Sequence, residues 1–372
     1  MRVVARVRDV PAKMKGWKRA DGEGVSFVPV PYYVGYQQFM MRWAKVMRAV
    51  RKAIGYEDAV ILRVPSLLAN LVVPHLLRRG QPFALQVGGD PWDLFSPGAV
   101  DFPWPVRLLA RWWFVRELKK QCKAAAAIAY VTQSRLQRRY PPGGSTFSIT
   151  FSDVELPHSA FLMRSWGSRS KSEPFNLITV ATLHQPYKGV DVLIDAVAQC
   201  IKEGLNLRLV VVGEGKYRRS LETQSISRGL EGHVYFLGEL PAGEAVREQL
   251  DQADLFVLAS RQEGLPRAML EAMARGLPCI GTTVGGIPEL LPPEDLVPPN
   301  DARALARKIA EVLKDQERMV RMSQRNYQKA MEYREEVLRE KRLTFYRFVR
   351  ELTEEWQKTQ RKAPSLVIRG MQ

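Results

Sequence analysis

The chain has 372 residues, 46% of them hydrophobic, with 56 Lys and Arg against 39 Asp and Glu. This length predicts two domains, each with a buried core. The three cysteines, Cys122, Cys200 and Cys279, lie far apart, which argues against a disulfide scaffold and favours a reducing compartment. No signal peptide is visible, and no apolar run approaches the ~18 residues of a spanning helix. We therefore expect a cytoplasmic protein whose membrane contacts, if it makes any, are peripheral.

Positive charge is concentrated in the first half of the chain. Residues 1–174 carry 27 Lys and Arg against 12 Asp and Glu, a net +15, whereas residues 175–372 carry 29 against 27. This asymmetry indicates an anionic partner for the first half. Nucleic acid, an acidic membrane surface and a phosphorylated acceptor all fit on charge alone.

Apolar runs in the first half predict strands at residues 3–7, 59–64, 83–87 and 127–131, and longer segments predict helices at 37–54 and 105–123. Both helices combine aromatic and basic residues. On the first, Phe39 and Trp43 begin an apolar stripe, and Arg48, Arg51 and Lys52 lie off it. Such a helix can lie on an anionic membrane, although a core-facing stripe beneath a solvated basic face is the commoner arrangement.

The Ser- and Gly-rich residues 164–174 predict a linker between two domains. Beyond it, short apolar runs alternate with helical segments, which is typical of βα units around a parallel sheet buried on both faces. Strands are predicted at 175–182, 207–212, 234–237, 254–260 and 279–281, and helices at 191–203, 217–228, 243–252, 267–275 and 302–313. A helical stretch from about 320 to 360 follows, with a break near Glu332 and Tyr333.

A glycine-containing loop before a helix is the first candidate site. The loop turns at Gly264 and the helix begins at Pro266, so its free N–H groups are available to a phosphate. Glu263 precedes this helix and Glu271 lies about one and a half turns inside it, so both can accept hydrogen bonds from ligand hydroxyls. The plainer alternative for Glu271 is a surface ion pair with an arginine four residues away, Arg267 or Arg275.

Two further turns follow predicted strands. Lys188 lies after the first strand of the second half, where doubly wound folds bind ligands, and can offer its charge to a diphosphate. A surface turn lysine fits that position equally well. Gly213 and Gly215 close the next strand in a Gly-x-Gly turn, which is a weak signal alone because the third glycine of a dinucleotide fingerprint is absent.

In combination, these residues resemble the retaining GT-B glycosyltransferases of family 4, also called group 1, over about residues 177–315. Six pieces occur in the family's order: Tyr-Lys188-Gly189-Val-Asp, Val-Gly213-Glu-Gly215, Phe-Leu237-Gly238, Ala-Asp-Leu-Phe-Val-Leu-Ala-Ser260, Glu263-Gly264-Leu265-Pro266 with Glu271, and Gly285-Gly286-Ile-Pro-Glu289. The resemblance implies an α/β fold of two Rossmann-like domains facing a central cleft. It also implies a nucleotide-diphosphate sugar as donor.

Carried over to this chain, the family pattern assigns Lys188 to the donor diphosphate and Glu271 to the ribose. Glu263, with the backbone of Gly264 and Leu265, is assigned to the transferred sugar. Asp90 stands where family members commonly carry a histidine, and it is the third catalytic candidate beside Lys188 and Glu263. The predicted donor site is completed by Thr182, Gly213, Gly215, Leu237 and Pro266.

The resemblance divides the chain into an acceptor-side domain (1–170), a donor domain (171–318), and a C-terminal helix with a tail (319–372). The helix is expected to return to the first domain. Family chains open with a strand and a glycine-rich loop. This chain opens with what resembles the second strand, so the first domain is expected to lack the usual first strand.

No metal or other cofactor is expected, because no Asp-x-Asp occurs and the four histidines show no metal-ligand spacing. The resemblance implies same-face displacement with retention and leaves the base, sugar and acceptor open; the acceptor is a lipid-linked saccharide, a polysaccharide precursor or a small metabolite. Three alternatives stay open: an impaired GT-B scaffold, a GT-B-like epimerase or phosphorylase, and, more remotely, a basic nucleic-acid-binding protein. The last is disfavoured because no nucleic-acid-binding motif occurs.

Overall fold

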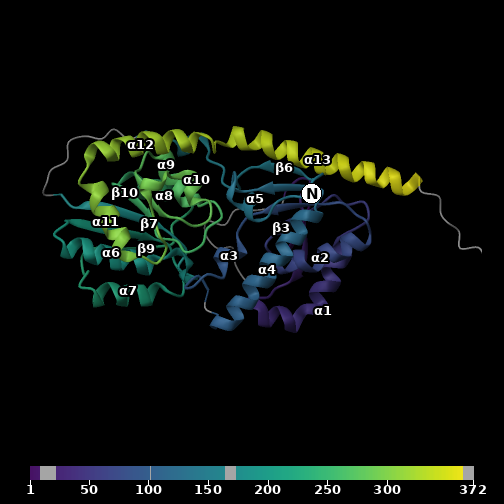
Figure 1. Cartoon of the computed structure of the whole chain (residues 1–372), viewed down its shortest axis with the longest axis horizontal. Helices are drawn as coiled ribbons and strands as arrows, with labels where there is room; N and C mark the ends of the chain where they lie inside the picture. Colours follow the sequence, from purple (N-terminus) through teal and green to yellow (C-terminus); the bar gives the residue numbers. More distant parts are fainter. Residues whose placement is uncertain (9–21, 101, 164–172, 363–372) are drawn as a thin grey trace, which may run out of the picture.

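The computed structural model describes residues 1–8, 22–100, 102–163 and 173–362. These residues form a two-stranded ribbon and two larger parallel sheets, each flanked by helices (Figure 1). Most of the predicted linker, residues 164–172, lies outside the described part. No helix among the described residues has the length and apolar character that a membrane span requires.

The first half contains a four-stranded parallel sheet of order β3-β4-β5-β6. Its elements are β1 (Arg2–Val7), β2 (Ser26–Pro31), α1 (Gly35–Ala53), β3 (Val60–Val64), α2 (Leu67–Arg78), β4 (Phe83–Val87), α3 (Pro91–Leu94), α4 (Trp104–Ala124), β5 (Ala127–Tyr130), α5 (Arg135–Arg139) and β6 (Phe147–Thr150). Alternate side chains enter two different cores, because successive strand residues point to opposite faces. Leu85 and Ile128 pack with α1, α2 and α4, whereas Ala84 and Ala127 face a second core that includes α13 (Glu335–Lys362).

The second half contains a six-stranded parallel sheet of order β12-β11-β10-β7-β8-β9. Its elements are β7 (Phe175–Val180), α6 (Val190–Lys202), β8 (Leu207–Val212), α7 (Arg218–Ser227), β9 (Val234–Gly238), α8 (Glu244–Asp251), β10 (Leu255–Leu258), α9 (Arg267–Ala274), β11 (Cys279–Thr282), α10 (Ile287–Leu290), β12 (Leu296–Val297) and α11 (Ala302–Leu313). The strand order reverses between β7 and β10. In open parallel sheets, ligands bind outside the carboxyl ends of strands at such a switch point.

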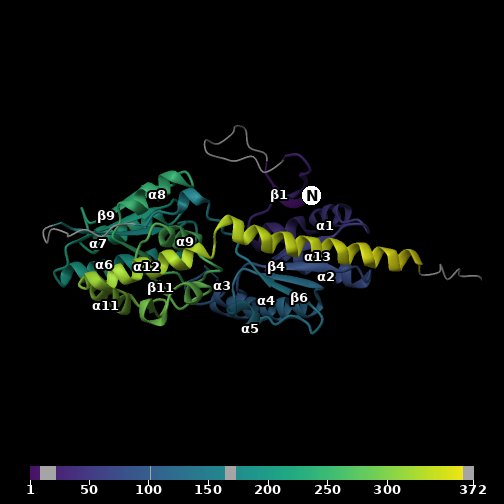
Figure 2. The same ribbon diagram turned by 90° about the horizontal axis from the view of Figure 1, so that it is seen from above.

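The C-terminal helices join the two halves. α12 (Gln316–Met331) packs on α9, and α13 then runs across the first sheet against β5 and β6 (Figure 2). Phe348 of α13 stacks on Phe147 at 4.3 Å between ring centroids, and Phe345 meets Phe151 edge-on at 5.6 Å. The break between the helices lies where the sequence predicted it, near Glu332 and Tyr333.

All predicted strands and helices are present within a few residues of their predicted bounds, and the α/β fold with parallel sheets is confirmed. Five of the described elements of the first half were not predicted: β2, α2, β6 and the short helices α3 and α5. β2 contains Pro29 and Pro31, which argue against a strand, and α2 is almost wholly apolar and contains Pro74. Neither segment shows a clean period of two or 3.6 residues, so pattern alone does not identify it.

Candidate active site

The carboxyl ends of the strands in the two large sheets meet at one place. Gly264, after β10, packs so closely on Gly88, after β4, that an added Cβ would lie 2.3 Å from the Gly88 carbonyl oxygen. Glu289 accepts hydrogen bonds from the backbone N–H groups of Ser134 and Arg135, after β5, at 2.9 and 2.8 Å. The two edges at which parallel sheets bind ligands therefore face each other.

Glu263 is at the centre of this junction, with only 6% of its surface exposed. Its Oε1 accepts a hydrogen bond from Lys188 Nζ at 2.7 Å and another from Ser260 Oγ at 2.6 Å. Burial alone would lower the pKa of Lys188, but the Glu263 carboxylate, with help from Tyr187, raises it. The structure thus brings together two of the three predicted catalytic residues as a buried, charged pair.

Arg261 fixes the turn that carries Lys188, a role that the sequence did not reveal. Its guanidinium donates to both carboxylate oxygens of Asp191, at 2.8 and 2.6 Å, and to the Pro186 carbonyl at 2.6 Å. Its backbone N–H also donates to the Tyr187 carbonyl at 2.6 Å. A bidentate pair of this kind adds geometric specificity as well as energy, so Lys188 is held at a set distance from Glu263. The only sequence signal was that an arginine lies within the Ser260–Glu263 loop.

Gly189 explains why glycine follows Lys188. Its φ is +65°, and an added Cβ would lie 1.9 Å from the Ala259 carbonyl oxygen. The left-handed backbone ends the short turn at Lys188, and the close approach to β10 places α6 directly behind it. No other residue type meets both conditions without moving the backbone.

The Gly-x-Gly turn packs on the same loop. An added Cβ on Gly213 would lie 1.8 Å from the Ala181 carbonyl oxygen, and one on Gly215 would lie 2.1 Å from the carbonyl carbon of Leu183. A pocket of about 200 Å³ opens beside this packing and is lined by Thr182 and Lys188, among others. The turn therefore shapes the wall of a hollow that contains two of the predicted donor-binding residues.

Glu271 lies on α9, mostly buried, and accepts a hydrogen bond from Arg267 Nε at 3.2 Å. Burial raises the pKa of its carboxyl group, and Arg267 opposes that shift. The ion pair that the sequence analysis gave as the alternative role of Glu271 is therefore present, with Arg267 as the partner. Arg275 instead binds both carboxylate oxygens of Asp251.

The remaining residues of the predicted donor site are Pro266, Leu265 and Leu237. Pro266 is buried at the start of α9, and Leu265 is half-buried beside Gly286, whose added Cβ would lie 2.8 Å from the Leu265 side chain. Leu237 is exposed near the end of β9.

Asp90 has a different environment from the other two catalytic candidates. It is 1% exposed, caps α3 through the Trp92 N–H at 2.8 Å, accepts from the Tyr140 hydroxyl at 2.5 Å and pairs with Arg139. Asp93, which was not among the predicted site residues, reaches the second half instead and accepts a hydrogen bond from the Gly285 N–H at 3.2 Å.

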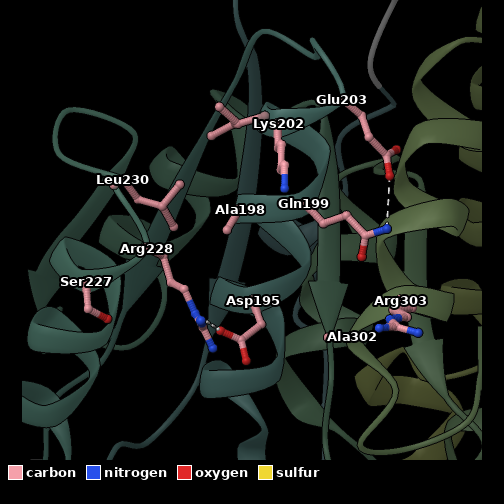
Figure 3. A pocket seen from close by; sticks show the side chains of 12 residues that line it. Asp195, Ala198, Gln199, Lys202, Glu203, Ser227, Arg228, Leu230, Ala302 and Arg303 are labelled. Atoms are coloured by element: carbon pink, nitrogen blue, oxygen red, sulfur yellow. Dashed lines mark hydrogen bonds and ion pairs between the residues drawn. The ribbon is translucent and has the colours of Figure 1, made fainter.

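A larger groove, of about 1100 Å³, lies on the outer side of the second half between α6 and the start of α11 (Figure 3). Within it, Arg228 donates to Asp195 at 2.8 Å and Gln199 to Glu203 at 2.9 Å. None of the predicted site residues lines it, so we place the candidate site at the junction of the sheets. Within the described ranges, no three His, Cys, Asp or Glu side chains gather so as to hold a metal ion.

Comparison with known proteins shows which sequences and structures the chain is similar to. Residues 165–329 match the sequence profile of the family described as glycosyl transferases group 1. Sucrose-phosphate synthase from Thermosynechococcus elongatus superposes with a TM-score of 0.68 at 18% identity, covering 94% of this chain and 88% of the synthase. HepE from Anabaena gives 0.60 at 18% identity, covering 91% and 86%. The fold is therefore that of the GT-B glycosyltransferases, and residues 165–329 are similar to the group 1 glycosyl transferases.

Two relatives show where the sequence likeness lies. Protein CapJ from Staphylococcus aureus is 26% identical over 292 residues, which are 78% of this chain and 72% of CapJ. The putative colanic acid biosynthesis glycosyltransferase WcaL from Escherichia coli is 39% identical over 151 residues, 38% of this chain and 37% of WcaL. The chain thus aligns with most of CapJ but little more than a third of WcaL.

The packing of Gly189 gives a first prediction. Gly189→Ala should destabilise the protein by about 1–3 kcal/mol more than Gly204→Ala, because both positions have a positive φ but an added Cβ meets nothing within 4 Å at Gly204. Urea unfolding of the two variants measures the difference. Equal losses would show that the β10 backbone yields and that the close approach does not fix the Lys188 turn.

Proposed function

We propose that the protein transfers a sugar from a nucleotide-diphosphate donor to an acceptor, with retention of configuration and without a metal ion. The product would belong to polysaccharide, glycolipid or other glycoconjugate biosynthesis. The observation that carries this proposal is the buried Lys188–Glu263 pair at the meeting point of the two carboxyl edges. Two similar proteins support it: the structure of HepE contains UDP and glucose, and WcaL is named as a putative colanic acid biosynthesis glycosyltransferase.

Lys188 would stabilise the leaving diphosphate. A raised pKa keeps its ammonium charged throughout the neutral range, because deprotonation requires still higher pH. The N-termini of α6 and α9 add free N–H groups and positive dipole ends near the same loop. These fixed groups would meet the growing charge of the leaving group without reorganisation, which is the role that a metal ion fills in other transferases.

Glu263 would hold the sugar rather than attack it. One of its oxygens already accepts from Lys188 and Ser260, which fixes the carboxylate and leaves its other oxygen to accept from a sugar hydroxyl. Same-face displacement then needs no covalent intermediate, because the acceptor enters on the side from which the diphosphate departs. Asp90 would act by positioning: its contacts hold α3 and Arg139 on the acceptor side.

The direct test is a product assay with purified protein, UDP- and GDP-sugars and a panel of acceptors. Slow release of free sugar without acceptor, and a sugar product with unchanged anomeric configuration, are expected. A catalytically impaired scaffold would bind nucleotide and release nothing. An epimerase would convert the donor and a phosphorylase would require inorganic phosphate, so each alternative gives a different product.

Glu271 provides the second prediction. Glu271→Gln should weaken nucleotide binding roughly 10- to 150-fold, because a charged acceptor for ribose hydroxyls contributes about 1.5–3 kcal/mol. Isothermal titration with UDP and GDP measures the affinity. Glu222→Gln is the matched control, since Glu222 forms a similar i,i+4 pair with Arg218 on an exposed face of α7. Unchanged affinity in the Glu271 variant would reduce Glu271 to a partner of Arg267.

Lys188 provides the third prediction. Lys188→Ala should lower kcat more than it weakens donor binding, because the charge on the diphosphate grows in the transition state. Steady-state kinetics and donor titration separate the two effects, and the exposed Lys202→Ala serves as control. A variant with a raised KM and an unchanged kcat would show that Lys188 contributes to binding only.

We further propose that the first half docks on an anionic membrane surface at the inner face of the cell membrane, near a lipid-linked acceptor. α4 exposes a row of large apolar side chains, including Leu109 at 69% and Trp112 at 60% exposure. α1 buries Phe39, Val46 and Val50 in the core, as the core-facing alternative expected, but exposes the basic residues Arg42, Lys45, Arg48, Arg51 and Lys52. Figure 1 shows both helices on the side of the first half away from α13.

Exposed aromatic and basic side chains on one side of a protein suit the interface of an acidic bilayer. Reversing Arg48, Arg51 and Lys52 to Glu should weaken binding to acidic vesicles at least about 100-fold, since each basic residue near the surface contributes about 1 kcal/mol. The matched control reverses three exposed basic residues of the second half, Lys202, Arg219 and Arg303. Co-sedimentation with vesicles with and without phosphatidylglycerol is the measurement. Equal binding to vesicles with and without phosphatidylglycerol at low salt would indicate that the positive charge of the first half serves a soluble anionic acceptor instead.

A further inference from the structure

Charged side chains gather around α3, at the carboxyl edge of the first sheet. Helix α3 follows β4 and α5 follows β5, and Figures 1 and 2 show α3 where the first half meets the second. The charged groups that act on one another here come from α3, α4, α5 and the residue before α3: Asp90, Asp93, Arg107, Arg111, Arg135 and Arg139. We call these six residues the α3 arginine cluster. It sets four guanidinium groups against two carboxylates.

The two carboxylates of the cluster already have close partners. Asp90 pairs with Arg139, which also lies 3.5 Å from an oxygen of Asp93. Asp93 accepts a hydrogen bond from the Gly285 N–H at 3.2 Å, whereas Arg135 approaches it only to 3.9 Å. Arg139 is therefore the arginine that the two aspartates neutralise most closely.

Arg107 and Arg111, on α4, form no ion pair with any described carboxylate. They lie four residues apart, a spacing at which like charges on a helix repel each other. The Nε atom of each is buried and has no hydrogen-bond partner among the described residues. Burial lowers the pKa of Arg111, Asp93 raises it, and Arg139 lowers it. Because an unpaired donor of a buried charged group is costly, an oxyanion beside these arginines would be stabilising.

Trp92, on α3, orients Arg111. The guanidinium carbon of Arg111 lies 3.5 Å from the centroid of the indole ring, which remains 46% exposed. Stacking of this kind occupies the face of a guanidinium and leaves its in-plane N–H groups able to bind an oxyanion. Arg111 is therefore held in one orientation before any ligand arrives.

The cluster borders the loop that carries Glu263. Asp93 binds the N–H of Gly285, and an added Cβ on Gly285 would lie only 2.1 Å from the Glu263 carbonyl oxygen. The backbone N–H of Arg135 donates to Glu289 at 2.8 Å, also across the junction. The arginines thus stand on the first-half side of the same site, opposite the loops that carry Lys188 and Glu263.

The donor set favours phosphate over a carboxylate or a neutral hydroxyl. The N–H groups of a guanidinium match two oxygens of a phosphate in a bidentate pair. A phosphate monoester carries a charge of about −1.5 to −2 at pH 7 and three strong acceptor oxygens, so it can bind two guanidinium groups at once. A carboxylate carries one charge and two oxygens, and would satisfy only one of the two arginines on α4.

Building on the proposed function, we propose that the α3 arginine cluster binds a phosphate group of the acceptor, which makes the acceptor a phosphorylated saccharide. Arg111, with Arg107 beside it, would bind the phosphate oxygens, and Trp92 would act as a positioning residue for Arg111. A soluble sugar phosphate or a lipid-linked saccharide can supply this group. The donor diphosphate would remain with Lys188, on the opposite side of the junction.

Isothermal titration with glucose 1-phosphate and with glucose, each at saturating UDP, tests the phosphate site. UDP occupies the donor side, so the probe reports on the remaining part of the junction. The wild-type protein should bind glucose 1-phosphate at least about 10-fold more tightly than glucose, because hydrogen bonds to charged groups are the stronger ones. Arg111→Gln should abolish this preference, and Arg111→Lys should restore part of it, because lysine keeps the charge but loses the planar fork.

Arg116→Gln is the matched control. Arg116 also lies on α4 and stacks on a tryptophan, Trp112, at 5.2 Å, but it is exposed and outside the cluster. This variant should keep the wild-type preference for glucose 1-phosphate. Equal binding of the two probes by the wild-type protein, or a preference that survives Arg111→Gln, would overturn the proposal.

Substitutions of Trp92 test its positioning role. Trp92→Leu should weaken binding of glucose 1-phosphate, and Trp92→Phe should recover part of the loss, because phenylalanine keeps an aromatic face for the guanidinium. Binding of UDP alone is measured in each variant. A loss of UDP affinity equal to the loss of glucose 1-phosphate affinity would assign the cluster to the donor and overturn the proposal.

The source of the phosphate is distinguished with methyl and decyl esters of glucose diphosphate. The apolar side chains that α4 exposes beside the cluster, Leu109 and Trp112 among them, would favour the decyl chain. Tighter binding of the decyl ester would assign a lipid-linked saccharide, and equal binding of the two esters a soluble sugar phosphate. Failure of the wild-type protein to bind UDP would overturn the proposed function as well, whereas UDP binding without a phosphate preference would overturn only the phosphate site.

Discussion

The buried pair between Lys188 and Glu263 is the interaction on which the arrangement of the site depends. Removing both charges from water is costly, so such a pair contributes little to stability and persists where geometry or chemistry requires it. Ser260 satisfies the carboxylate further, and Arg261 with Asp191 fixes the turn that carries the lysine. The loops after β7 and β10, on either side of the topological switch, are thereby locked to each other. Under the proposed function, a donor bound there would meet charges that are already in place.

Backbone packing is the second constraint, and it explains the glycines better than flexibility does. Gly189, Gly213 and Gly215 bring the ends of β7, β8 and β10 closer together than side chains would permit, and Gly264 does the same between the two halves. Each glycine therefore sets the distance between a charged loop and its neighbour. A Cβ at any of these positions would displace the loop that carries Lys188 or Glu263.

The sequence predicted the fold well, and it singled out the loops that carry Lys188 and Glu263, because both depend on local signals. Alternating apolar and helical runs define βα units, and Lys188, Gly189 and Glu263 occur in motifs with fixed order. Contacts between residues that lie far apart in the sequence could not be predicted from local patterns. Nothing local indicates that Arg261 binds Asp191, or that Asp93, rather than Asp90, contacts the second half at Gly285. Asp90, which was selected by its position in the sequence, caps α3 and accepts a hydrogen bond from Tyr140. Only the tertiary structure distinguishes its carboxylate from that of Asp93.

The two halves are held together by contacts of different kinds. At the site the contacts are polar and small, such as Glu289 on the backbone of Ser134 and Asp93 on that of Gly285, and water can replace these hydrogen bonds if the loops separate. Along α13 the contacts are aromatic, between Phe345, Phe348 and the first sheet, and water cannot replace them. Separating the two halves at the site therefore costs less free energy than separating them along α13. Under the proposed function, this difference would let a donor enter a junction whose charges are otherwise buried.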